Sequence, residues 1–126
     1  MKILILGATG FIGRNMIEHF SSDSSNQVTA TYNHRPSYEN EKIRWVKCNL
    51  VDSLQVHEIM QDVDVVIQAA ATTSGSKDIV NKPYIHTTDN AVMNSYIFRA
   101  AAEAKVKNVI FFSCTVMYPS SIQPLR

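Results

Sequence analysis

Three of the chain's four glycines lie in one run near its start, Gly7-Ala8-Thr9-Gly10-Phe11-Ile12-Gly13. The apolar residues Ile3–Leu6 precede this run and predict a short buried strand. After it, apolar residues recur at helical spacing as far as Phe20, which predicts a helix. A glycine-rich turn between a strand and a helix is typical of a site that holds the pyrophosphate of a dinucleotide.

Each glycine of the run has its own task in such a turn. Gly7 permits the tight turn off the strand, Gly10 lets the backbone approach a pyrophosphate, and Gly13 lets the helix pack closely on the sheet. The free amides and the positive end of the helix would hold the phosphates. A structural turn without a ligand is the alternative, and a P-loop is excluded because no Gly-Lys-Ser/Thr follows.

Strand-like and helix-like segments alternate along the whole chain. Strands are expected at Ile3–Leu6, Val28–Tyr32, Arg44–Cys48, Val63–Ala69 and Asn108–Ser113. Helices are expected after Gly10, from Ser53 to about Gln61, and from Tyr84 or Thr87 to Ala104. This order predicts an α/β fold: a Rossmann-type doubly wound parallel sheet of about five strands, in the order 3-2-1-4-5, with helices on both faces.

Two finer expectations concern the later helices. Ser53 is expected to cap the second helix, with Leu54 and Ile59 turned inward. The third helix is rich in alanine and apolar nearly all round, which predicts that it is well buried.

Composition limits the class of protein. The 126 residues suggest one domain, and the net charge of +1 leaves no broad electrostatic surface for nucleic acid or membrane. No apolar run approaches the ~18 residues of a membrane span. Cys48 and Cys114 have neither disulfide-framework nor metal-ligand spacing, which argues against a metal site and fits a reducing cytoplasm.

The G-x-x-G-x-x-G spacing resembles that of the extended short-chain dehydrogenase/reductases, the NAD(P)-dependent epimerase/dehydratase group that acts on nucleotide sugars. Four further segments resemble motifs of this family in the same order along the chain. They are Cys48-Asn49-Leu50-Val51-Asp52, Asp64 to Ala71, Asp89 to Asn94, and Ile110 to Tyr118. The resemblance covers essentially the whole chain and implies the family's fold, cofactor and nucleotide-sugar substrate.

The resemblance also implies which residues bind the cofactor. Asn49 stands where the family's aspartate contacts the adenine amine, and Leu50 would supply an amide and an apolar contact; a plain turn residue is the alternative for Asn49. The alanines after the fourth strand would let the backbone lie against the cofactor, or would serve helix packing. The expected cofactor-binding set is Gly7, Thr9, Gly10, Phe11, Ile12, Gly13, Asn33, Arg35, Asn49, Leu50, Ala69, Ala70, Ala71 and Asn90.

The end of the second strand bears on the choice between NAD and NADP. NAD-specific folds place an acid there to bond the ribose hydroxyls, but the chain reads Thr31-Tyr32-Asn33-His34-Arg35-Pro36, with no acid before Glu39. Arg35 would pair with a 2′-phosphate, so NADP is expected in preference to NAD. Arg35 as a solvated surface charge is the alternative.

Catalysis in this family uses a Ser or Thr at the end of the fifth strand and a later Tyr-x-x-x-Lys. The hydroxyl position falls on Cys114, with Ser113 and Thr115 on either side as substitutes, and a small buried cysteine is the alternative. No Tyr-x-x-x-Lys follows Tyr118. The chain is therefore expected to be the N-terminal, NAD(P)-binding part (1–126) of a longer enzyme; the alternative is a non-catalytic NAD(P)-binding sensor or interaction module. A homodimer that covers the exposed edge of the last strand is also expected.

Overall fold

The computed structural model describes residues 1–35, 37–38, 40–72 and 81–113. Its five strands are β1 (Lys2–Leu6), β2 (Gln27–Tyr32), β3 (Ile43–Lys47), β4 (Val65–Gln68) and β5 (Asn108–Phe111). Its helices are α1 (Phe11–Ser21), α2 (Ser53–Ile59) and α4 (Pro83–Glu103). All strand pairs are parallel and the sheet order is β3-β2-β1-β4-β5, which confirms the predicted topology.

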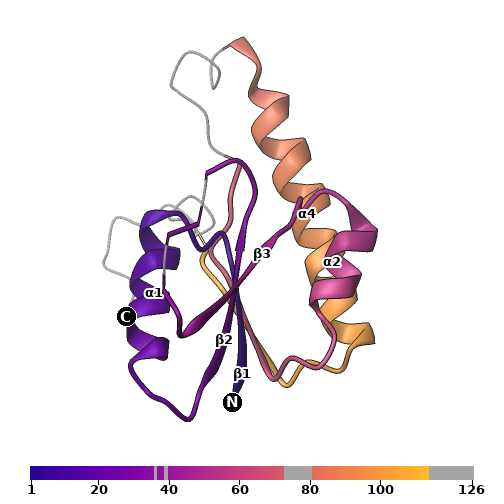
Figure 1. Cartoon of the computed structure of the whole chain (residues 1–126). Helices are drawn as coiled ribbons and strands as arrows, with labels where there is room; N and C mark the ends of the chain where they lie inside the picture. The colour runs from indigo at the N-terminus through magenta and orange to yellow at the C-terminus, as the bar shows by residue number, and fades with distance from the viewer. Residues whose placement is uncertain (36, 39, 73–80, 114–126) are drawn as a thin grey trace, which may run out of the picture.

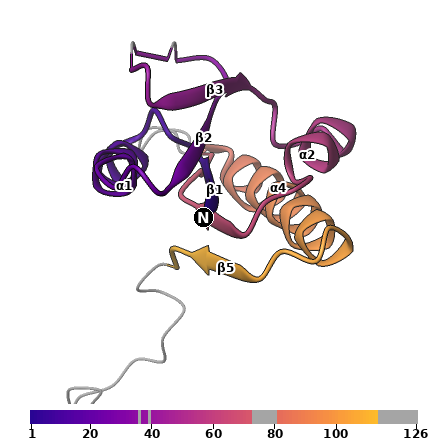
Figure 2. The ribbon, with the colours of Figure 1, turned by 60° about the horizontal axis from the view of Figure 1, so that its bottom comes forward.

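The helices cover both faces of the sheet, as expected (Figure 2). Ile3 and Ile5 of β1 point to the face covered by α1, where they pack with Ile17. Leu4 and Leu6 alternate to the other face and pack with residues of α2 and α4. Because β1 is buried on both faces, its side chains are apolar throughout the strand after Lys2.

The expected cap of α2 is wrong by one residue. Asp52, not Ser53, is the N-cap: its carboxylate accepts hydrogen bonds from the amides of Leu54 and Gln55 at 3.0 and 3.3 Å. This start turns Leu54 outward, where 75% of it is exposed, and buries Val56 instead. Ile59 does pack against the core, as expected.

The expectation of an all-round buried third helix is also wrong. In α4 the buried residues are Met93, Ile97, Ala100 and Ala101, which form a single stripe at helical spacing. The helix begins at Pro83, and its first turns extend past the carboxyl edge of the sheet (Figure 1), so that they have no sheet to cover. None of the described helices is long and apolar enough to cross a membrane.

Asp64 joins the starts of three neighbouring strands. Its carboxylate accepts from the backbone amide of Lys2 at 2.9 Å and from the Nζ of Lys107 at 2.7 Å. The Lys107 side chain and then the Lys2 amide hold the pKa of Asp64 below its ordinary value, because both favour the charged carboxylate. Asp64 therefore fixes the amino-terminal edge of the sheet, opposite the edge where the glycine turn lies.

Candidate dinucleotide-binding site

The glycine turn connects the end of β1 to the start of α1. Gly7 has a φ of 73°, in the left-handed region that favours glycine, and its carbonyl accepts from the amide of Gly10 at 3.0 Å. A Cβ on Gly7 would lie 2.5 Å from the Cα of Ala70, and one on Gly13 would lie 2.4 Å from the Gly7 oxygen. Backbone packing therefore requires glycine at both positions, as the sequence predicts.

Gly10 differs from the other two glycines. Among the described residues, a Cβ there would meet only the Gly7 oxygen, at 3.3 Å, which is a tight contact but a single one. The protein's own packing therefore gives less reason for glycine here than at Gly7 and Gly13. A ligand that must approach the backbone closely would supply a further reason.

The first turn of α1 has the properties of an anion site. Gly10 is the N-cap and offers no side-chain acceptor, and the turn contains no acidic residue. Within the described part of the chain, the amides of Phe11, Ile12 and Gly13 have no recorded acceptor. Phe11 is 86% exposed and Ile12 is also exposed, which leaves the start of the helix open. Unpaired amides and the positive end of a helix dipole suit a pyrophosphate, so the residues present fit a dinucleotide.

Thr31 of β2 holds the glycine turn in place, a role that sequence reasoning missed. Its hydroxyl accepts from the amide of Gly7 at 3.2 Å, and its carbonyl accepts from the amide of Ala8 at 3.1 Å. The side chain is buried. A threonine in a strand is ordinary, so no local sequence signal distinguishes this one.

The backbone after β4 forms the other side of the turn. The amide of Ala69 donates to the carbonyl of Leu6 at 3.1 Å, and Ala70 packs against Gly7. Ala71 follows and is exposed. Asn90 of α4 bonds the Thr72 backbone twice, at 2.9 and 3.0 Å, so its amide group holds this loop. The structure thus brings Ala69 and Ala70 beside the glycine turn, and direct contact of Asn90 with a cofactor stays a prediction.

Asn49 and Leu50 follow β3. The Asn49 side-chain oxygen accepts from the amide of Val51 at 3.3 Å, which gives the turn interpretation direct support. Leu50 turns into the core formed with α2 and α4. Because a carbonyl oxygen can accept two hydrogen bonds, this turn does not exclude the adenine contact of Asn49, which stays a prediction. Burial raises the pKa of the neighbouring Cys48 thiol to about 11, which keeps this thiol protonated at neutral pH.

Asn33 and Arg35 lie exposed in the segment after β2. Nearby, Tyr38 packs edge-on against Trp45 of β3 at 5.0 Å between ring centroids, and the Arg14 guanidinium of α1 lies 5.3 Å from the Tyr38 ring. The Tyr38 hydroxyl and the Trp45 indole N–H are buried and have no hydrogen-bond partner in the described part of the chain. The sequence prediction included neither Arg14 nor this aromatic pair.

Of the predicted catalytic residues, Ser113 lies just beyond β5 and is exposed. Cys114 and Thr115 lie outside the described residues. The strands are parallel, so the end of β5 lies at the same edge of the sheet as the glycine turn and Gln68. The amide of Phe112 donates to the Gln68 carbonyl at 3.5 Å, which continues the pairing toward Ser113.

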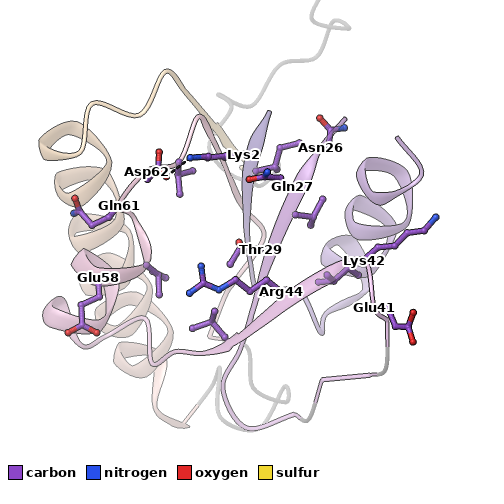
Figure 3. Close-up of a pocket in the computed structure, with 16 residues that line it drawn as sticks. Lys2, Asn26, Gln27, Thr29, Glu41, Lys42, Arg44, Glu58, Gln61 and Asp62 are labelled. Atoms are coloured by element: carbon purple, nitrogen blue, oxygen red, sulfur yellow. Dashed lines mark hydrogen bonds and ion pairs between the residues drawn. The ribbon is translucent and has the colours of Figure 1, made fainter. Parts of the chain in front are cut away.

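A hollow of about 710 Å³ lies elsewhere, along the starts of β1 and β2 and beside α2 (Figure 3). Lys2 and Asp62 form an ion pair in its wall, and the Arg44 side chain extends across β2 toward α2. Lys2 and Gln27 open their strands, whereas the glycine turn follows the end of β1. The hollow is therefore separate from the candidate dinucleotide site.

A parallel sheet in this order, with a glycine turn at its carboxyl edge, defines a Rossmann-type dinucleotide-binding fold. A family model described as the NAD dependent epimerase/dehydratase family matches residues 3–125. The match covers nearly all of the sequence, and the chain belongs to this family.

Curated relatives match most of the chain. Auxiliary protein GraX of Staphylococcus aureus is 27% identical over 110 residues, which are 87% of this chain and 35% of GraX. GDP-L-colitose synthase of Yersinia pseudotuberculosis is 24% identical over 119 residues, 94% of this chain and 35% of that protein. The chain thus spans about a third of the length of these relatives.

Solved structures share the fold. UDP-N-acetylglucosamine 4-epimerase from Methanobrevibacter ruminantium, in complex with UDP-N-acetylmuramic acid, has a TM-score of 0.83 and 26% identity, covering 99% of this chain and 42% of that one. WbmH of Bordetella bronchiseptica, in complex with NAD+, has a TM-score of 0.80 and 23% identity, and the match covers 97% of this chain and 42% of WbmH. At 23% identity, the similarity to WbmH shows a shared fold and no more.

Proposed function

We propose that the chain binds NAD(P) as the dinucleotide-binding portion of a longer cytoplasmic enzyme that acts on a nucleotide sugar. The reaction class is epimerase, dehydratase or keto-reductase. The glycine turn carries the proposal, because Gly10, which has no side chain, opens a helix whose first amides lack acceptors within the described residues. The names of GDP-L-colitose synthase and UDP-glucose 4-epimerase support the substrate class. The small share of each relative that the chain covers supports a longer enzyme.

In this proposal the chain's own residues bind and orient. When bound, the nicotinamide supplies hydride transfer. The amides at the start of α1, from Phe11 onward, would hold the pyrophosphate, and the backbone at Ala69 and Ala70 would support the glycine turn beside it. One of the predicted catalytic residues Ser113, Cys114 and Thr115 would hydrogen-bond the reacting oxygen of the sugar.

Titration with NAD+ and NADP+, followed by calorimetry, tests cofactor binding. Gly10→Ala should weaken binding at least about tenfold, because its methyl group enters the space reserved for the pyrophosphate. Glu18→Ala, an exposed change later in α1, is the matched control and should bind like the wild type. Binding by Gly10→Ala at wild-type affinity would contradict this placement of the site, and a wild type that binds neither dinucleotide would overturn the function.

For the cofactor we propose NADP in preference to NAD. The segment after β2 presents Arg35 to solvent and carries no acid before Glu39. Arg35→Ala should weaken NADP+ binding about tenfold and leave NAD+ binding unchanged. Lys42→Ala removes an exposed cation farther along the same loop and should change neither affinity. Tighter binding of NAD+ than NADP+ by the wild type would contradict the preference.

For the chain alone we propose cofactor binding without turnover, because no Tyr-x-x-x-Lys follows Tyr118 in it. Incubation with UDP-glucose and either dinucleotide, followed by chromatography of the sugar nucleotides, tests this. Unchanged UDP-glucose is the expected result. Formation of an epimer or a reduced product would show that the chain carries its own catalytic groups.

A further inference from the structure

Gln68, the last residue of β4, is a buried polar side chain whose hydrogen-bonding groups are all engaged. It is 1% exposed. Its Oε1 accepts from the Ala70 amide at 3.2 Å, and its Nε2 donates to the Ala70 carbonyl at 3.2 Å. The same Nε2 donates to the Oδ1 of Asn94 on α4 at 2.8 Å. One side chain thus binds both backbone groups of Ala70 and is itself held by α4.

Ala70 is also the residue on which the glycine turn rests. The space where a Cβ of Gly7 would stand is filled by the Cα and N of Ala70, at 2.5 and 2.6 Å. A shift of Ala70 by a few tenths of an ångström must therefore move Gly7 or open a gap beside it. The contacts run without a break from Asn94 through Gln68 and Ala70 to Gly7.

The loop has a second support that does not act on Ala70. Asn90, one turn earlier on α4, binds the backbone of Thr72. Removing Asn94 would leave Thr72 tied to the helix and would release only the portion of the loop that contacts Gly7. The Gln68–Asn94 pair can therefore be tested separately from the anchoring of the whole loop.

We propose that Gln68 and Asn94 are positioning residues for the dinucleotide: without touching it, they set the Ala70 backbone against the glycine turn and so set the cofactor affinity. This inference rests on the proposed NAD(P) binding. The Asn94 oxygen orients the Gln68 amide group, and an amide so oriented presents its donor and its acceptor to Ala70 in one arrangement. Without that oxygen, the buried amide loses a partner and its orientation is no longer fixed.

Asn94→Leu and Asn94→Asp test the pair. Leucine is close in size but accepts no hydrogen bond, whereas aspartate keeps the oxygen that accepts from Gln68. Asn94→Leu should weaken binding of the preferred dinucleotide about tenfold and speed amide hydrogen exchange at Ala70 about tenfold. Asn94→Asp should restore both values to within about twofold of the wild type.

Ile97→Val is the control for general loss of stability, since Ile97 is buried on the same helix and packs only in the apolar core. It should leave affinity and Ala70 exchange unchanged. Asn94→Ala serves in place of Asn94→Leu if circular dichroism shows the leucine variant to be unfolded.

The outcomes separate the two proposals. Binding by the wild type together with equal binding and equal Ala70 exchange in Asn94→Leu would overturn the positioning role and leave NAD(P) binding intact. A loss in Ile97→Val as large as that in Asn94→Leu would also overturn it, because general destabilisation would explain both. A wild type that binds neither dinucleotide would overturn the proposed function and this inference together.

Discussion

Gly7 and Ala70 pack backbone to backbone, so closely that a Cβ added to Gly7 would lie 2.5 Å from the Ala70 Cα. They follow the adjacent parallel strands β1 and β4. The glycine turn and the loop after β4 are therefore packed against each other through their backbones. Gly7 also has a φ of 73°, so two independent reasons exclude a side chain there.

Gly7→Ala should destabilise the fold by about 3 kcal/mol, since the left-handed backbone and the overlap with Ala70 both oppose a methyl group. Urea denaturation followed by circular dichroism measures this loss. Gly10→Ala is the paired control: among the described residues its Cβ meets only the Gly7 oxygen, and we expect a loss of about 1 kcal/mol for the poorer N-cap. Equal losses in the two variants would contradict the packing argument.

Asp52→Ala should clearly lower the stability of the chain through loss of the α2 cap, whereas Ser53→Ala should leave it nearly unchanged. Asp52 accepts from two backbone amides, and its second oxygen accepts from the Gln55 side chain at 2.7 Å. The same urea titration compares the variants. A larger loss in Ser53→Ala would reverse the assignment of the cap.

The sequence predicts the sheet well because burial on both faces leaves a strong pattern. Apolar runs at β1 and β4 identify strands, and their alternation with helical segments leaves essentially one parallel topology. The sequence predicts the details of the helices poorly. Asp52 and Ser53 are both good caps, and only the backbone decides between them. The composition of α4 does not reveal that its first turns extend beyond the sheet.

The candidate site also contains residues that the sequence predicts and residues that it does not. Gly7 and Gly13 are predictable because the backbone around each leaves no room for a Cβ, whereas the role of Gly10 toward a ligand stays a prediction. The sequence does not predict the contacts of Thr31 or of the Gln68–Asn94 pair, because these ordinary polar residues meet their partners only when distant parts of the chain come together. Gln68 and Asn94 are 26 residues apart, and no periodicity relates them.

Asp64→Asn should remove part of the pH dependence of stability. Lys107, and after it the Lys2 amide, hold the folded pKa of Asp64 below its ordinary value of 3.8. A carboxyl with a lowered folded pKa stabilises the fold above the unfolded pKa, and this contribution is lost as the pH falls through the folded pKa. The stability difference between the wild type and Asp64→Asn should therefore be full above about pH 5 and shrink below it.

Urea midpoints between pH 7 and pH 3 measure that difference. Lys107→Met should flatten the same acid limb, because Lys107 is the largest cause of the shift. A difference that stays constant over this range would show that the Asp64 carboxylate does not contribute through its charge.

Ile110→Lys should reduce self-association of the chain. In the described part of the chain, β5 pairs with β4 and is an edge strand of the sheet, and Val109, Ile110 and Phe111 are all exposed on it. An apolar edge strand pairs readily with another copy, and a lysine there opposes such pairing. Sedimentation velocity over a range of concentrations should show a dimer for the wild type and mainly monomer for the variant. Leu54→Lys, an equally drastic change at an exposed position on α2 away from the edge, should leave the wild-type dimer unchanged. If Leu54→Lys lowers association as much as Ile110→Lys, general surface charge rather than the β5 edge controls the assembly.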